Sequence, residues 1–276
     1  MKFLPFIFIL LSFSQLVNAQ SINAFEIPRS RVIDIKDPIS KRVYPIFVKL
    51  PASYGRDHNK SYPVIYLTDA LYSFQIVSGA TRFPMNTDKM EEAIIVGISY
   101  SKGSKGPSSR IRDFTHKKDH SWKFETGQAL QHANFIENVI FPYIKSHYRV
   151  NNSRTYVGNS LGGLLGAYIF LTKPHMFTNY ILGSPSVWFM NSDILSIKPK
   201  QNSNAHKIFI AVGERETPKY DSPRHDMVTG AQKLVSKLSG EHFPNVEVKL
   251  LIIQGANHET AFPTTATQGL YWLFKK

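Results

Sequence analysis

The pentapeptide at residues 158–162 constrains the fold more than any other stretch of this chain. It reads G-N-S-L-G with Ser160 at its centre, and it lies between a β-type run at 154–157 and an apolar helical pattern at 161–171. In that context G-x-S-x-G predicts a nucleophile elbow, a strained strand-to-helix turn that lifts a serine hydroxyl above a sheet. The two glycines are needed because backbone approaches backbone there. A coincidental Gly/Ser turn is the alternative, and the flanking strand and helix disfavour it.

The rest of the chain alternates between strand and helix patterns. Short apolar or alternating runs predict strands at residues 32–35, 42–50, 63–67, 93–98, 154–157, 180–182, 207–212 and 246–253. Helical periodicity is found at residues 71–80, 127–148 with a kink or break at Pro142, 161–171, about 226–239 and 261–275. The alternation predicts an α/β protein with a mainly parallel central sheet and helices on both faces, with catalytic groups at the carboxyl ends of the strands. Residues 99–124 are polar and irregular, which favours a long functional loop.

The N-terminal residues differ from the remainder. Lys2 precedes an apolar run at 3–11, and small residues at 17–19 suit a signal peptidase. We therefore expect residues 1–19 to be a signal peptide cut after Ala19, and the mature protein to be exported to the periplasm or secreted. Polar residues from Ser12 onward end the run too soon for a membrane anchor, which needs about 18 apolar residues. No stable membrane insertion is expected after cleavage.

Length and composition favour one domain over residues 20–276. The 276 residues are 42% hydrophobic and contain no repeat or Gly/Ser linker. The chain has no cysteine, which excludes disulfides, thiol catalysis, cysteine metal sites and a lipoprotein anchor. The formal charge of +13 is spread along the chain without a recognised nucleic-acid module, so an anionic small molecule is favoured over nucleic acid as partner. The sequence carries no signal for an oligomeric state.

A serine nucleophile needs a base and, in this topology, the expected chain order is serine, acid, histidine. His258 follows the last predicted strand and precedes the last helix, so we predict it to be the base. The acid should follow the strand at 207–212, where Glu214 and Glu216 lie. Glu216 is preferred because three residues beyond Gly213 leave the chain room to turn back. Asp221, Asp226 and a Ser-His dyad without an acid are the alternatives.

An acyl-transfer site also needs preorganised N–H donors for the oxyanion. The topology assigns one to the amide of Leu161, directly after the nucleophile. It assigns the other to the loop after the strand at 63–67, where Ala70 is preferred and Leu71 is the alternative.

Four segments resemble the putative esterase family: the elbow at 156–163, Y-L-T-D-A at 66–70, R-I-R-D-F-T at 110–115 and G-S-P-S-V-W-F at 183–189. That family includes esterase D, the siderophore esterases and the mycolyltransferases, and the likeness covers nearly all of the mature chain. The siderophore-esterase branch, with its R-x-R-D and S-P-S-x-W segments, is the most similar. The resemblance implies the α/β-hydrolase fold and hydrolysis of carboxylic esters without a cofactor. The chain departs from the family at Ala70, where glycine is usual, and at His116, where proline is usual.

Three further features bear on the substrate. Arg110 and Arg112 could grip an anionic ester with paired N–H donors, or one of them could form a structural ion pair with Asp113. Trp188 could line an acyl or aromatic pocket. The H-K-K-D-H segment at 116–120 could hold a metal, but a solvated polar loop is favoured, so no metal is predicted.

These features together predict an exported serine esterase that forms an acyl-enzyme on Ser160. The leading substrate is an anionic ester such as a catecholate siderophore trilactone. An acyltransferase, or an esterase of carbohydrate or short-chain acyl groups, is the alternative. A non-catalytic binding protein with this fold is disfavoured by the intact Ser160 and His258.

Overall fold

Short apolar runs build one eight-stranded sheet in the order β1-β2-β4-β3-β5-β6-β7-β8. The computed structural model describes residues 24–200, 203–223, 225–240 and 243–276, so the expected signal peptide lies outside the described residues. The strands are β1 (Ser30–Lys36), β2 (Val43–Lys49), β3 (Tyr62–Leu67), β4 (Ile94–Ile98), β5 (Val150–Asn159), β6 (Asn179–Gly183), β7 (His206–Gly213) and β8 (Val246–Ile253). β2 pairs antiparallel with β1 and β4, and β3 to β8 are parallel. The expected mainly parallel sheet is confirmed.

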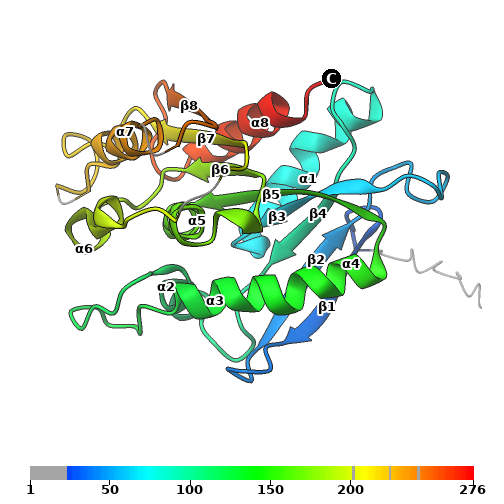
Figure 1. Ribbon diagram of the computed structural model, residues 1–276, viewed down its shortest axis with the longest axis horizontal. Helices are drawn as coiled ribbons and strands as arrows, with labels where there is room; N and C mark the ends of the chain where they lie inside the picture. Colours follow the sequence, from blue (N-terminus) through cyan, green and yellow to red (C-terminus); the bar gives the residue numbers. More distant parts are fainter. Residues whose placement is uncertain (1–23, 201–202, 224, 241–242) are drawn as a thin grey trace, which may run out of the picture.

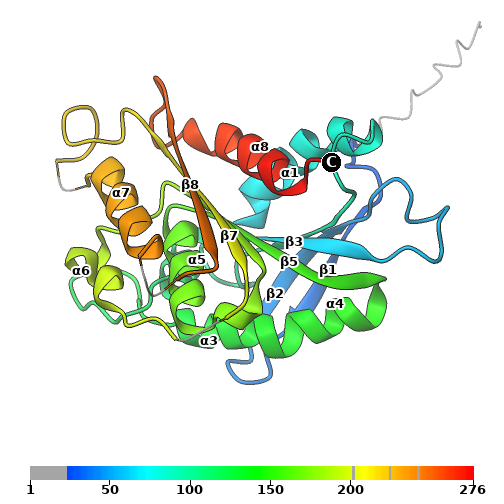
Figure 2. The ribbon, with the colours of Figure 1, turned by 45° about the horizontal axis from the view of Figure 1, so that its top comes forward.

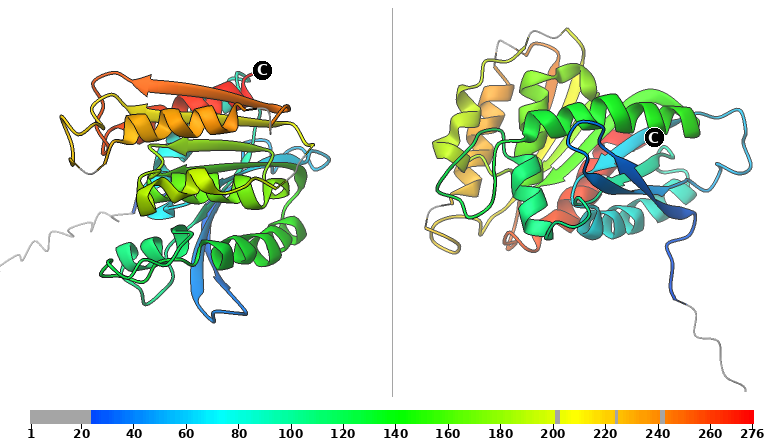
Figure 3. Two further views of the ribbon diagram at one scale, coloured as in Figure 1. Left: turned by 60° about the vertical axis from the view of Figure 1, so that its left-hand side comes forward. Right: turned by 90° about the horizontal axis from the view of Figure 1, so that it is seen from below.

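Helices cover both faces of this sheet, as Figures 1 and 3 show. The helical segments are α1 (Ala70–Asn86), α2 (Gly106–Phe114), α3 (Ala129–Phe135), η1 (Ile136–Ile140), α4 (Phe141–His147), α5 (Leu161–Thr172), η2 (Pro174–Met176), α6 (Phe189–Ser192), η3 (Asp193–Ser196), α7 (Met227–Leu238) and α8 (Ala261–Phe274). α1 and α8 lie side by side on one face (Figure 2), and α3, α4, α5 and α7 pack on the other.

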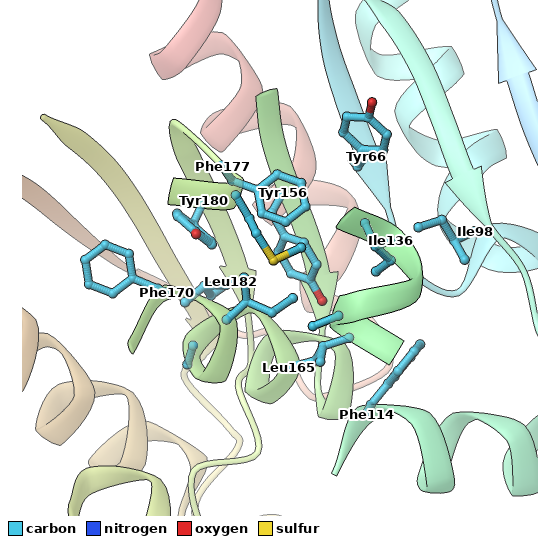
Figure 4. Packing of buried hydrophobic residues seen from close by; sticks show 14 of the residues in the cluster. Tyr66, Ile98, Phe114, Ile136, Tyr156, Leu165, Phe170, Phe177, Tyr180 and Leu182 are labelled. Atoms are coloured by element: carbon cyan, nitrogen blue, oxygen red, sulfur yellow. The ribbon is translucent and has the colours of Figure 1, made fainter. Parts of the chain in front are cut away.

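The larger of the two cores lies under α5. Figure 4 shows Tyr156, Phe177 and Tyr180 in contact beside Leu165 and Leu182. All five side chains are buried. This packing fixes the strand before the elbow against the helix after it, so the position of Ser160 is set by the core.

Two predictions of local structure are corrected by the structure. Residues 99–124 are not irregular throughout, because α2 occupies Gly106–Phe114 within them. Pro107 stands in its first turn, where proline's missing N–H costs no hydrogen bond, so the Gly-Pro pair marks a helix start. The expected 71–80 helix continues through Pro84 to Asn86.

The long helical pattern at 127–148 is interrupted just before Pro142. The interruption takes the form of the π-helical turn η1 between α3 and α4. Proline cannot donate to the helical ladder and its ring crowds the preceding turn, and an added residue in the turn relieves this conflict. The backbone therefore remains helical through Pro142, with a widened turn in place of the expected kink or break.

None of the helices in the described ranges has the length and apolarity needed to traverse a bilayer.

Candidate active site

Ser160 lies at the turn between β5 and α5 with φ 58° and ψ −117°, a conformation that a serine rarely adopts. Its amide donates to the Gly183 carbonyl at 2.8 Å, which anchors the turn to β6. Such strain persists only where the surroundings over-determine it. The geometry is that of a nucleophile elbow.

The glycines around Ser160 are required by close backbone contacts. A Cβ atom on Gly158 would lie 2.4 Å from the Gly162 carbonyl oxygen, and one on Gly162 would lie 2.5 Å from Thr68 Oγ1. A Cβ on Gly163 would lie 2.9 Å from the Gly183 oxygen. The sequence pattern therefore reflects a steric need at each of these positions.

His258 is held by a buried carboxylate. Its Nδ1 lies 2.6 Å from Glu216 Oε2, and the Glu216 side chain is fully buried while that of His258 is 31% exposed. The hydrogen bond to Glu216 raises the pKa of His258, against an opposing effect of burial. Because Nδ1 is engaged, Nε2 is the ring nitrogen left to exchange a proton with a substrate or nucleophile.

The second oxygen of Glu216 is also fully engaged. Oε1 accepts from Ser184 Oγ at 2.6 Å and from the Gly213 amide at 2.7 Å. The Arg215 amide donates to the Ala256 carbonyl at 2.9 Å, which ties the loop after β7 to the loop after β8. This contact brings the Glu216 and His258 loops together.

The other candidate acids are occupied elsewhere. Glu214 accepts from the Gly255 amide at 2.9 Å, and Asp226 caps α7 by accepting from the Thr229 amide. Asp221 is exposed. Of the carboxylates weighed from the sequence, the structure brings only Glu216 to the imidazole.

The Ser160 hydroxyl has Ser186 as its neighbour. The two Oγ atoms are 3.3 Å apart, and the Ser186 amide donates to the Ser160 carbonyl at 3.1 Å. Within the described part of the chain Ser160 Oγ is not hydrogen-bonded to His258. Nucleophile–base hydrogen bonds are often long before substrate binds and shorten in the complex.

Both predicted oxyanion donors are the first residues of helices. Leu161 begins α5 and Ala70 begins α1, so neither amide has an acceptor within its own helix. The left-handed conformation before α1 falls on Asp69, with φ 55°. Because Ala70 itself is free of positive φ, the backbone at this position does not require a glycine.

The two arginines of α2 have different environments. Arg112 is 6% exposed and binds Asp113 through Nε and Nη2 at 2.8 and 2.9 Å. It therefore forms the structural ion pair that the sequence left open, and the expectation that it contacts substrate is corrected. Arg110 is partly exposed; its Nε donates to Asp69 at 2.8 Å and its Nη2 to the Asn159 carbonyl at 2.9 Å.

Trp188 lies within an aromatic stack. One neighbour is the His225 ring at 3.9 Å and 17°, and the other is Trp122 at 6.1 Å and 12°. The indole is partly exposed. The segment at 116–120 was the one considered for a metal. The His116 side chain is buried, its Nε2 lies 3.4 Å from Asp193 Oδ2, and its ring stacks on Tyr168. In the described ranges no three His, Cys, Asp or Glu side chains gather as a metal site requires.

Sequence reasoning missed three members of the site. Ser184 and Ser186 stood in the S-P-S segment, but only the folded chain places them against Glu216 and Ser160. Tyr100 donates to Asp69 at 2.7 Å, so it shares that carboxylate with Arg110. Ser184 and Ser186 lie in a quoted motif and Tyr100 in none, and the partners of all three depend on loops that follow different strands.

The fold and this arrangement of serine, histidine and glutamate define an α/β hydrolase with the elements of a serine hydrolase site. The family model described as "Putative esterase" matches residues 39–267, and the chain belongs to that family. It is a carboxylic ester hydrolase.

Curated and solved relatives agree with this assignment. The chain is 31% identical over 274 residues to the ferri-bacillibactin esterase of Bacillus subtilis, covering 92% of each chain. The crystal structure of the BES protein from Bacillus cereus matches with a TM-score of 0.76 and 26% identity, over 94% of this chain and 98% of that one. A siderophore hydrolase from Aspergillus nidulans shares the fold, with a TM-score of 0.79, 20% identity, and 92% and 97% coverage.

Proposed function

We propose that this protein is an exported serine esterase that hydrolyses a siderophore ester, with a catecholate trilactone as the leading substrate. The observation that carries the mechanism is the buried Glu216–His258 pair beside the strained Ser160 turn. The observation that supports the substrate class is the match to a ferri-bacillibactin esterase along 92% of both chains.

In the first half of the reaction, Ser160 Oγ attacks the ester carbonyl carbon and His258 Nε2 takes the hydroxyl proton. Glu216 holds the imidazole tautomer and stabilises the cation that forms. The Leu161 and Ala70 amides donate to the oxyanion. The ester C–O bond then breaks, and the leaving alkoxide receives the proton from His258.

Water completes the cycle. His258 removes a proton from a water molecule that attacks the acyl-enzyme, and the same proton returns to Ser160 as the acid is released. If a sugar hydroxyl replaced water, the same acyl-enzyme would carry out acyl transfer, which is the second candidate reaction.

Arg110 connects the site to an anionic substrate. Its Nε and Nη2 are held by Asp69 and the Asn159 carbonyl, and 23% of its side chain is exposed. We assign its exposed edge to the anionic part of the ester, and the partly exposed Trp188 edge to an aryl or acyl group.

A substrate panel tests the proposal. Neutral aryl esters, anionic catecholate trilactones and acetylated sugars are compared at two salt concentrations, with product analysis for acyl transfer. The anionic ester should be hydrolysed fastest. Its kcat/KM should fall as the salt concentration rises, because a Debye length of ~10 Å at 0.1 M screens exposed charges. A wide preference for neutral or sugar esters, insensitive to salt, would reject the siderophore assignment and leave the esterase mechanism standing. N-terminal sequencing of protein recovered outside the cytoplasm should begin at Gln20.

A further inference from the structure

A cavity of about 370 Å³ lies away from the catalytic residues, between the chain just before β1, the end of β2 and the middle of α1. Lys49, on its wall, pairs with Ile95 near the start of β4. Ser160 instead follows the end of β5, which runs in the same direction as β4. The cavity is therefore toward the opposite end of the sheet from the elbow, and the proposed mechanism does not use it.

Three cations line this cavity, and the described residues of its wall provide no counter-ion. They are Arg29, Lys49 and Arg82, and no Asp or Glu is among the lining residues that the structure describes. In the described part of the chain none of the three is in a salt bridge. Arg29 and Arg82 are exposed, whereas Lys49 is only 5% exposed, and burial together with the two arginines lowers the pKa of its ammonium group to about 8. Buried positive charge of this kind is unfavourable until an anion compensates it.

Two polar groups of the cavity, the Arg29 side chain and the Ser78 hydroxyl, have distinct environments. Arg29 has φ 61°, its Nε donates to the Leu50 carbonyl at 3.2 Å and its carbonyl accepts from the Leu50 amide at 3.0 Å. Such a backbone conformation outside glycine needs strong local support. Ser78 Oγ, also on the wall, is buried and has no hydrogen-bond partner among the described residues. A hydroxyl in that state is a ready donor to an oxyanion.

The rest of the lining is mainly apolar, with Gln75 as a further polar residue and with the Phe25 side chain 91% exposed. Phe25 and Ile27 line one side, and the volume suits one small molecule. The combination of a cationic floor and apolar sides distinguishes this cavity from a merely solvated basic surface, because an inorganic ion alone would leave the apolar side uncovered.

We propose that this cavity binds an organic oxyanion: a carboxylate or phosphate group, on a compact apolar body. The oxyanion lies among Arg29, Lys49, Arg82 and the Ser78 hydroxyl, and the body packs on Phe25 and Ile27. The site is separate from the esterase centre and does not depend on the esterase assignment.

Calorimetric titration of the full mature chain tests the proposal with benzoate, phenyl phosphate and neutral benzyl alcohol. At least one anion should bind at one site per chain, at least about tenfold more tightly than benzyl alcohol. The tighter anion identifies carboxylate or phosphate as the recognised group. Equal binding of benzyl alcohol, or no anion binding at millimolar concentration, would overturn the proposal.

Variants and a crystal soak locate the site. Lys49→Met and Arg82→Gln should each weaken anion binding about tenfold or more, whereas Lys36→Met, which removes one charge from an exposed position of β1, should not. All three should retain ester hydrolysis. Arg82 is exposed, so its variant keeps the test valid if Lys49→Met fails to fold. Bromine anomalous density from soaked 4-bromobenzoate should lie in the cavity, and density only beside Ser160 would contradict the proposal.

Discussion

Glu216 Oε2 lies 2.6 Å from His258 Nδ1, although 42 residues separate the two along the chain. Glu214, only two positions from Glu216, instead accepts from the Gly255 amide. The difference arises because the loop after β7 turns inward between these two glutamates, which leaves Glu214 exposed and Glu216 buried.

This relationship predicts unequal effects for two isosteric changes. Glu216→Gln should lower kcat by ~10²–10⁴-fold, because an amide no longer fixes the imidazole tautomer or stabilises its cation. Glu214→Gln should stay within about threefold, under 1 kcal/mol on the rate scale. Steady-state kinetics with a chromogenic ester makes the comparison. If both variants keep nearly full activity, the site operates as a Ser-His dyad.

The pH profile should follow the imidazole. The Glu216 hydrogen bond raises the pKa of His258, and only the neutral ring can act as base. The rate kcat/KM should therefore rise with pH through a midpoint above the ordinary value of about 6.5, and Glu216→Gln should move that midpoint down. The effect of this pKa on folding stability has the opposite pH dependence to its effect on kcat/KM. The raised pKa contributes stability at low pH that is lost as pH rises through the folded-state pKa. A midpoint unmoved by Glu216→Gln would assign it to another group.

Covalent labelling distinguishes Ser160 from its hydroxyl neighbour. Ser160→Ala should abolish ester hydrolysis and labelling by a fluorophosphonate, because no other serine occupies the elbow. Ser186→Ala is the matched control, since its Oγ is only 3.3 Å away, and it should still be labelled at Ser160. Mass spectrometry of the labelled peptide reads out the result. If the wild type is labelled on Ser186, then Ser186 and not Ser160 is the nucleophile.

Arg110→Met should affect two properties at once. The variant loses the hydrogen bond to the Asn159 carbonyl, directly before the nucleophile, so hydrolysis of neutral esters should also slow. The salt dependence of anionic ester hydrolysis should disappear, because the exposed cation is gone. Rates for both ester classes at two salt concentrations separate the effects. Unchanged neutral rates would show that Arg110 does not position the elbow.

Arg112→Met should act on stability rather than on substrate choice. Removing one partner of the buried Arg112–Asp113 pair leaves a carboxylate without its charge partner, a change that costs about 3–5 kcal/mol in unfolding free energy. Denaturant titration measures it, and Asp113→Asn should be similarly destabilising. The ratio of anionic to neutral ester hydrolysis should not change. If the variant is stable but its selectivity is altered, Arg112 contacts the substrate after all.

The α/β sheet, the elbow and the order of serine, acid and histidine were all predictable from the sequence. Short segments of sequence carry the signal for each of these features. Apolar runs indicate strands, 3.6-residue periodicity indicates helices, and the glycines beside Ser160 indicate a turn in which backbones approach closely. The position of His258 after the last strand follows from the same topology. These features can be predicted because each depends mainly on residues that are neighbours in the sequence.

Tertiary structure alone decided the partners of individual side chains. Which glutamate reaches His258, which arginine is buried and what Ser186 touches all depend on loops that meet only after the strands have aligned. The three cations of the cavity are likewise dispersed in the sequence, just before β1, at the end of β2 and in the C-terminal part of α1. Their proximity arises because α1 packs across the end of β2, and no local pattern records that packing.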